Sequence, residues 1–205
     1  MKRALLLTTL LAVVPIYSPF ANLVNNGDFE AGPTETTKYA FWETPGWWNR
    51  AKRDNAQGLN ARIASNDESG FNATVNDRGD LASSFTQNTK YTIEHGDEYE
   101  ISLDMRAGID WQGADRLEVI LFATSDNTLS GSVVWEEIVE MGDVVGAEWT
   151  TETHTFKPVP PAAVGKTLFL NFYGVDPAES QKTGYLRVDN IVLTNKAADG
   201  AAAQP

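Results

Sequence analysis

The feature that most limits the fold of this sequence is the short period of its apolar residues. In the segment Tyr99–Arg106 every second residue is large and apolar, and the residues between them are polar. Successive side chains of a β-strand point to opposite faces, so this period predicts a strand with one buried face. Leu117–Ala123 and Leu168–Tyr173 are apolar on nearly both faces, which is typical of central strands in a sandwich.

Further segments have the length and pattern of strands, and turns rich in Gly, Pro, Asn and Asp separate them. They are Leu23–Glu30, Asn60–Ser65, Asn72–Val75, Leu81–Gln87, Val133–Val139, Trp149–Lys157 and Tyr185–Thr194. About ten short strands without intervening helical patterns predict an all-β protein, a two-sheet antiparallel β-sandwich. We expect the first and last strands, Asn22–Glu30 and Tyr185–Thr194, to close the domain.

Residues 1–21 have the layout of a secretory signal peptide. A basic start, Met1–Arg3, precedes the apolar run Ala4–Ile16, and small or helix-breaking residues follow. The run is too short to span a bilayer as a stable helix, so cleavage after Ala21 predicts a secreted or periplasmic protein without membrane contact. An uncleaved membrane anchor is the alternative. A lipid anchor on cysteine is excluded because the sequence contains none.

The acidic balance of the chain limits its partners. The formal charge is −12, and removing Lys2 and Arg3 with the signal peptide brings it to −14. Phosphate backbones and anionic membranes repel such a chain, so nucleic acid is not an expected partner. Without cysteine the chain has no disulfide and no thiolate metal site, whereas its carboxylates suit Ca²⁺.

The mature chain is predicted to form one domain, residues 22–195, because no linker or internal repeat divides it. Roughly 180 residues suffice for a single all-β domain with its own core. Residues 196–205 are rich in alanine and lack an apolar face, so we expect a disordered tail there.

Two motifs near the ends of the mature chain carry a family resemblance. The first is NLVNNGDFEAG at Asn22–Gly32, and the second is YLRVDNIVL at Tyr185–Leu193. Between them lie Pro45–Trp47, Phe85–Gln87, Gly96–Ala107 and Trp149–Phe156. In this order the segments resemble the galactose-binding-like jelly roll, in particular carbohydrate-binding modules of the CBM4/9/22 type. The resemblance covers essentially the whole mature chain and implies a non-catalytic protein that binds a polysaccharide or oligosaccharide.

The resembled family holds a structural Ca²⁺ between the start and the end of the domain. By position, the resemblance implies carboxylate ligands at Glu30 and Asp189, the backbone carbonyl of Asp28, and Glu68 from the segment Asp67–Gly70. Calcium takes roughly six to eight oxygen ligands and mixes carboxylates with carbonyls, which suits this acidic chain. The alternative is that Glu30 and Asp189 cap turns by accepting backbone hydrogen bonds.

Exposed aromatic faces are the second ingredient of a saccharide site, because the apolar side of a sugar ring stacks on them. Trp47 is expected in the core, which places its neighbour Trp48 on the opposite face as a platform for a ligand. Trp111 in a loop and Trp135 on a strand are compatible with either ligand contact or core packing. Scattered positions of Trp48, Trp111 and Trp135 would favour a module without a sugar site.

Tyr173, Asn171 and Arg106 complete the predicted binding set. Tyr173 and Asn171 share one face of their strand, opposite Leu170 and Phe172, and Arg106 lies on the polar face of another strand. Side chains of these types line saccharide clefts, where they hydrogen-bond to hydroxyl groups. The alternative is a solvated outer face of a sheet.

Recognisable catalytic chemistry is missing from the sequence. His95 and His154 have no nucleophile in a familiar setting, and no nucleophile elbow, zinc-protease helix or phosphate loop occurs. The neighbours Glu136 and Glu137 point to opposite faces of a strand, so they do not form an acid–base pair. We therefore predict a binding protein rather than an enzyme. The alternatives are an extracellular structural or adhesion module that contacts other extracellular proteins, and a small polysaccharide lyase or hydrolase.

Overall fold

The computed structural model describes residues 21–31, 46–48, 62–66, 70–77, 84–142, 144, 146–178 and 182–197 of the chain. For residues 48, 62–66, 70 and 71 it describes the backbone only. The predicted calcium ligand Glu68 and residues 1–20 of the predicted signal peptide lie outside these ranges. Within the ranges, no helix has the length and apolar character needed to cross a membrane.

Ten strands and one short 3-10 helix form the described part of the chain. They are β1 (Trp47–Trp48), β2 (Arg62–Asn66), β3 (Gly70–Asn76), β4 (Phe85–Thr92), β5 (Tyr99–Ala107), β6 (Arg116–Thr124), β7 (Val133–Met141), β8 (Thr150–Thr155), η3 (Pro161–Ala163), β9 (Thr167–Val175) and β10 (Tyr185–Asn195).

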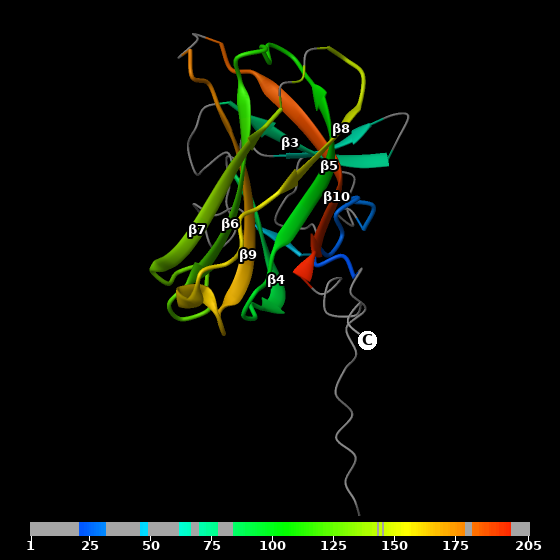
Figure 1. Cartoon of the computed structure of the whole chain (residues 1–205). Coiled ribbons are helices and arrows are strands. Elements are labelled where there is room, and N and C mark those ends of the chain that lie inside the picture. The colour runs from blue at the N-terminus through cyan, green and yellow to red at the C-terminus, as the bar shows by residue number, and fades with distance from the viewer. Residues whose placement is uncertain are drawn as a thin grey trace, which may run out of the picture.

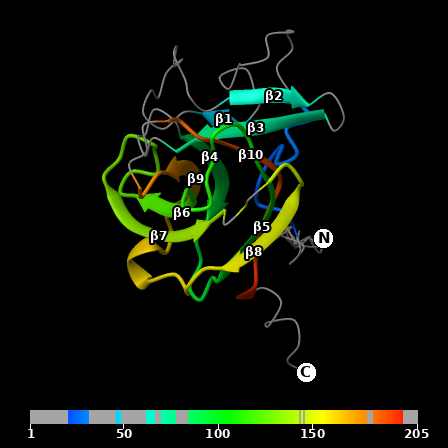
Figure 2. The ribbon, with the colours of Figure 1, turned by 90° about the horizontal axis from the view of Figure 1, so that it is seen from above.

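The strands form two five-stranded sheets that pack face to face (Figure 1). Sheet A has the order β1-β4-β9-β6-β7, and sheet B has the order β2-β3-β10-β5-β8. Every neighbouring pair is antiparallel. Figure 2 shows β6 and β7 on one side of the molecule and β5 and β8 on the other. The predicted all-β, two-sheet antiparallel sandwich is therefore confirmed.

The core lies between the two sheets and follows from the alternation along each strand. In β5 the inward residues Tyr99, Ile101, Leu103 and Met105 are fully buried, and the residues between them are partly exposed. The inward residues of β6 and β9 meet them from sheet A. Burial of apolar surface supplies the main stabilisation of such a sandwich, at roughly 25 cal/mol per Å².

An aromatic cluster closes one end of the core. Trp47 is buried, as predicted, and its ring centroid lies 5.2 Å from that of Phe85 and 5.4 Å from that of Phe29. Phe85 in turn stacks on Phe172 at 4.7 Å. The Trp47 indole N–H donates to the carbonyl oxygen of Asn26 at 2.9 Å, so its polar atom is also satisfied.

The prediction of a first strand at Leu23–Glu30 is wrong. This stretch consists of bends and turns, because Asn26 and Phe29 have φ values of 54° and 56°, which interrupt an extended chain. The segment nevertheless lies along the last strand: Leu23 N–H donates to the Leu193 carbonyl at 2.8 Å.

Gly27 allows this close approach to β10. A Cβ at Gly27 would collide with the carbonyl oxygen of Ile191, and Ile191 N–H donates to the Gly27 carbonyl at 2.9 Å. The first and last segments of the domain are therefore joined, as predicted, although the first is not a strand. Strand β1 was missed, because a two-residue strand is too short to show a period.

Candidate functional site

The strand register divides the surface of the sandwich into two outer faces with different chemistry. One is the outer face of sheet A, and the other is the outer face of sheet B. Residues paired across neighbouring strands lie on the same face, so each face can be followed row by row.

The central row on the outer face of sheet A contains the predicted residues Trp48 and Asn171. It runs through directly paired residues in the order Trp48, Thr86, Asn171, Ile120 and Ile138. Thr86 and Asn171 are fully buried, and the Thr86 hydroxyl donates to Asn171 Oδ1 at 2.6 Å. The side-chain position of Trp48 lies outside what the structure describes, but its register places it next to Thr86.

Asn171 has an unsatisfied donor on this face. Its Nδ2 is buried and has no hydrogen-bond partner among the residues that the structure describes. A buried amide group without a partner costs roughly 1–3 kcal/mol, so such a group calls for an explanation. Asn171 is fully buried, so this group is not accessible to a ligand from outside.

An aromatic row lies beside the Asn171 row on the same face. Phe122 and Phe169 are paired across β6 and β9, and their rings stack at 5.1 Å with an interplanar angle of 23°. Together with Ile120 they form a small second core, against which Tyr173 and Leu129 pack. Tyr173 is only partly buried, so its ring is the accessible edge of this apolar group.

The sequence signal for this second core was present but was interpreted differently. The segments containing Phe122 and Phe169 were expected to be apolar on both faces because central strands are buried in a sandwich. In a two-layer sandwich, however, one face of every strand points away from the core. Large apolar residues on that face therefore indicate that something else covers it.

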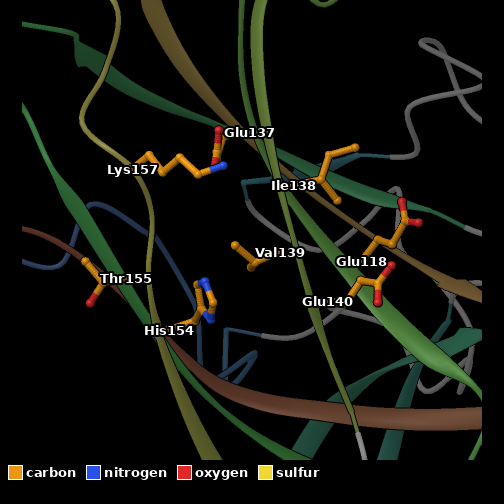
Figure 3. A pocket seen from close by; sticks show the side chains of 8 residues that line it. All are labelled: Glu118, Glu137, Ile138, Val139, Glu140, His154, Thr155 and Lys157. Atoms are coloured by element: carbon orange, nitrogen blue, oxygen red, sulfur yellow. The ribbon is translucent and has the colours of Figure 1, made fainter.

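A depression of about 590 Å³ lies beside strand β7, between β7 of sheet A and β8 of sheet B, where His154, Thr155 and Lys157 also line it (Figure 3). Glu118 and Glu140 are paired directly across β6 and β7, and Glu118 is also paired with Tyr173. On the other side of β7, Glu137 Oε1 forms an ion pair with Lys157 Nζ at 3.2 Å. Like charges opposite each other destabilise a sheet, so the Glu118–Glu140 pair lowers the stability of sheet A at this position.

Two of the predicted tryptophan platforms are not exposed on this face. Trp111 is 7 % exposed and belongs to the main core, so it cannot stack on a ligand. Trp135 is paired with the core residue Ala123 and packs partly buried against the same core. Both indoles pack against the core between the sheets. Their positions in the sequence did not indicate this direction.

Arg106 lies on the other outer face, so the predicted cleft of Tyr173, Asn171 and Arg106 does not form. Arg106 belongs to β5 in sheet B, and its guanidinium carbon lies 5.2 Å from the centroid of the Trp149 ring. That distance is typical of a cation–π contact. Tyr173 and Asn171 do share a face, as predicted, opposite Leu170 and Phe172.

The rest of the outer face of sheet B is a ladder of polar pairs between β5 and β8. Thr153 Oγ1 donates to Ser102 Oγ at 3.2 Å, and Thr155 Oγ1 donates to a carboxylate oxygen of Glu100 at 3.3 Å. These threonines are exposed, as on an ordinary solvated sheet.

On its central strand β10, sheet B carries the predicted metal ligand Asp189. The β10–β5 register shifts between Asp189 and Val192, and Asn190 within this β-bulge has a φ of 49°. The bulge brings the VDNI motif against the NGDFE motif, which explains why both ends of the sequence carry the family pattern. A depression of about 320 Å³ lies between them, lined by backbone of both segments, including Gly27, Asp28 and Ile191.

Burial and neighbouring carboxylates both disfavour the charged form of Asp189 in this position. It is 6 % exposed, and burial raises its pKa to about 7 despite the hydrogen bond that it accepts from Asn190 N–H. The carboxylates of Glu30, Asp104 and Asp28 raise this pKa further. A divalent cation would relieve this repulsion, because it favours the charged form of each carboxylate.

Asn72 supports a cation at the same place and was missed by the sequence reasoning. It lies on β3, one step beyond the paired residues Val188 and Ala73, and therefore beside Asp189. Its side chain is fully buried, and both its Oδ1 and its Nδ2 lack a hydrogen-bond partner within the described part of the chain. An amide oxygen is a ligand that Ca²⁺ accepts, so the residues present fit the group.

A tighter carboxylate group lies elsewhere in the described part of the chain. One oxygen from each of Asp77, Asp115 and Asp176 lies within 4.8 Å of the others. Burial raises the pKa of Asp77 and of Asp115, and the neighbouring carboxylates of the group add to both shifts. Each aspartate stands at a strand end, so only the folded chain shows that they meet.

The family comparison agrees with this architecture. Residues 21–176 match the sequence profile of the carbohydrate-binding domain family CBM4/9, and the chain belongs to that family. It is a non-catalytic carbohydrate-binding module. No curated protein matches the sequence.

Solved structures with the same fold are distant in sequence. The CBM22-1 xylan-binding domain of Xyn10C from Paenibacillus barcinonensis is 13% identical, with a TM-score of 0.51, covering 85% of this chain and 94% of its own. A cyclase from Fischerella sp. TAU, bound to 4-(1H-indol-3-yl)butan-2-one, is 17% identical with a TM-score of 0.54, covering 84% and 96%.

The same fold occurs inside larger enzymes. The arabinose-bound α-L-arabinofuranosidase MgGH51 is 14% identical with a TM-score of 0.52, and the match covers 86% of this chain. This chain spans only 26% of that protein. Because the fold occurs in binding modules and in enzymes, it does not identify the ligand.

Proposed function

We propose that this protein is an exported module that holds a neutral saccharide on the outer face of sheet A and is stabilised by Ca²⁺ on the outer face of sheet B. The observation that carries the saccharide proposal is the partly exposed aromatic ring of Tyr173 on the outer face of a chain that belongs to a carbohydrate-binding family. A sugar needs an apolar surface for its ring and hydrogen-bond partners for its hydroxyls.

The charge of the face favours a neutral ligand over an acidic one. Glu118, Glu136 and Glu140 lie on the outer face of β6 and β7, and the whole chain has a formal charge of −12. Uronic acid or sulfated polymers would meet like charge there, whereas neutral hydroxyl groups can donate to the carboxylates. Xylan is the first polysaccharide to test, because a xylan-binding domain shares the fold.

The calcium proposal is supported by the residues around the β10 bulge. Asp189, Glu30 and the Asp28 carbonyl are the predicted ligands, and Asn72 Oδ1 adds a buried oxygen without a partner. Bound calcium would join the start of the domain to its last strand and would neutralise the repulsion at Asp189. Export to a secreted or periplasmic location is proposed on the sequence of residues 1–21 alone.

A polysaccharide panel tests the saccharide site. Purified protein is run through affinity gels containing xylan, β-glucans, galactans, mannans or polyuronates, and the dissociation constant of each retarding polymer is measured by calorimetry. We expect retardation by neutral polymers only. If no neutral polysaccharide retards the protein, the proposed function is wrong.

Matched variants locate the site on one face. We expect Tyr173→Ala to weaken saccharide binding about tenfold, which corresponds to about 1.4 kcal/mol. Trp149→Ala removes a comparable, partly exposed aromatic ring from the outer face of sheet B and should leave binding unchanged. The opposite result would move the site to sheet B.

A further inference from the structure

Exposed apolar side chains are concentrated along strand β7. The large hydrophobic residues that are exposed in the described part of the chain are Ile109, Val133, Val134, Ile138, Val164 and Val192. Three of them, with exposed fractions of 43 %, 40 % and 45 %, belong to β7. Val164 directly follows η3, which contacts β7. Such a concentration on one element marks an interaction surface better than scattered single residues do.

Strand β7 is also an edge strand. It lies at the end of sheet A and pairs only with β6. One side of its nine-residue backbone therefore has no neighbouring strand in the described ranges. The unpaired backbone N–H and C=O groups of such an edge can form hydrogen bonds with the backbone of an added strand.

The side chains of β7 indicate which charge a strand added to this edge should carry. On the outer face, Ile138 lies between Glu136 and Glu140, and both glutamates are exposed. If another strand pairs with β7, basic residues opposite the glutamates stabilise the pairing. An apolar residue opposite Ile138 stabilises it as well. Because these three residues share one face of β7, the arrangement favours a partner strand in which apolar and basic residues take turns at every second position.

The same glutamates disfavour a second copy of the chain. Two β7 strands brought edge to edge would place two rows of glutamates close together, and the chain as a whole has a formal charge of −12. The negative charge of the chain attracts a basic partner electrostatically, and main-chain hydrogen bonds to the free edge then hold it.

We propose that the free edge of β7 binds an extended segment of another extracellular polypeptide, in which apolar residues and lysine or arginine take turns at every second position, so that both lie on one face. The segment adds a sixth strand to sheet A. Its apolar residues contact Ile138 and Val134, and its basic residues pair with Glu136 and Glu140. The module would then bind a protein through its sheet edge, next to the saccharide on the outer face, because Glu136 and Glu140 border both.

Two synthetic peptides of the length of β7 test the proposal. In one, valine and lysine take turns at every second position, with threonine at the positions between them; in the other, glutamate replaces lysine. Binding is measured by fluorescence anisotropy at low and high salt, and the contact is located by hydrogen exchange of the β7 amides. We expect the lysine peptide to bind, to protect β7, and to weaken with salt, and the glutamate peptide not to bind.

Variants of exposed residues separate edge pairing from general charge attraction. Glu136→Lys combined with Glu140→Lys should reverse the peptide preference. Ile138→Lys should weaken binding of the lysine peptide at least about tenfold, because it places a charge on the edge. Ile109→Lys changes a more exposed apolar residue in a loop, 76 % exposed, and should have no effect.

Several outcomes would overturn the proposal. They are equal binding of both peptides, protection located on β8 or on a loop, and no protection at all. Protection of β7 by self-association without peptide would assign the edge to a second copy, and protection by a neutral oligosaccharide would assign it to the glycan. Only the last of these results bears on the saccharide proposal, because it would extend the glycan site to β7; the others leave that proposal untouched.

Discussion

The two outer faces of this sandwich are built from the same kind of strand but carry opposite chemistry. On sheet B, the outer residues of β5 and β8 are threonine, serine and carboxylates that hydrogen-bond across the strands. On sheet A, the outer residues of β6 and β9 include Ile120, Phe122 and Phe169, which are buried. The first face is solvated, whereas on the second Leu129 and Tyr173 pack against the apolar side chains and Tyr173 stays partly exposed.

The comparison shows that strand alternation alone does not predict which face is functional. Strand β5 follows the ordinary rule, with an apolar inner face and a polar outer face. Strands β6 and β9 break it on the face where Asn171 also lacks a partner for its Nδ2. Departures from the local rule are therefore concentrated on one side of the molecule, which is where we place the saccharide.

The largest expected effect comes from truncating the second core on sheet A. Phe169→Ala removes a fully buried ring and should lower the free energy of unfolding by about 3–5 kcal/mol, because it leaves a cavity on the outer face. Thr153→Ala on the outer face of sheet B should change it by less than about 0.5 kcal/mol. Urea denaturation of both variants checks this. Equal effects would mean that the two faces do not differ energetically.

Removal of calcium is expected to act through sheet B. With free calcium at about 100–1,000 times its dissociation constant, the ion stabilises the fold by about 3–4 kcal/mol, so EDTA should lower the melting temperature by several degrees. Asp189→Asn should abolish this sensitivity. Glu100→Gln, another outer-face carboxylate of sheet B, should keep it. A melting curve that EDTA does not move would remove the metal from the proposed function.

The pH dependence of the calcium-free protein follows from Asp189. Its pKa of about 7 in the folded state lies above the ordinary value of 3.8, so the folded state binds a proton more tightly than the unfolded chain does. Stability should therefore fall as the pH rises from about 4 to about 7, by a few kcal/mol at most. Urea denaturation in EDTA at several pH values measures this slope. Asp189→Asn should flatten it, and an unchanged slope would assign the effect to other carboxylates.

The smallest expected effect concerns the like-charged pair on sheet A. Glu140→Gln removes the repulsion with Glu118 and should raise the free energy of unfolding by about 0.2–1 kcal/mol. The gain should shrink at high salt, because salt already screens exposed charges. Glu136→Gln, opposite Phe122, is the matched control and should have little effect. If Glu140→Gln destabilises the protein, the carboxylate has a favourable partner that the pairing does not reveal.

Part of the site could be predicted from the sequence. The two-residue period located β5, and the shared face of Tyr173 and Asn171 followed from it. The motifs at the two chain ends correctly indicated that these ends meet, and the hydrogen bonds between Gly27 and Ile191 show how. These features depend on residues close together in sequence or on a recognised pattern.

The remaining parts depended on contacts that no local pattern records. Trp111 and Trp135 pack against the core, and Arg106 lies on the other sheet from Asn171. Asn72 comes next to Asp189 only because β3 pairs with β10 across more than a hundred residues of chain. A strand pattern gives the direction of a side chain relative to its own strand, but not which strand lies beside it.

The sequence by itself determined that this chain folds as an antiparallel sandwich with an acidic surface, because alternation and charge are properties of short segments. Only the tertiary structure decided that the two outer faces differ. The order of the strands within each sheet sets which outward side chains become neighbours. That order places apolar rings and an unsatisfied amide on sheet A, and carboxylates around a β-bulge on sheet B.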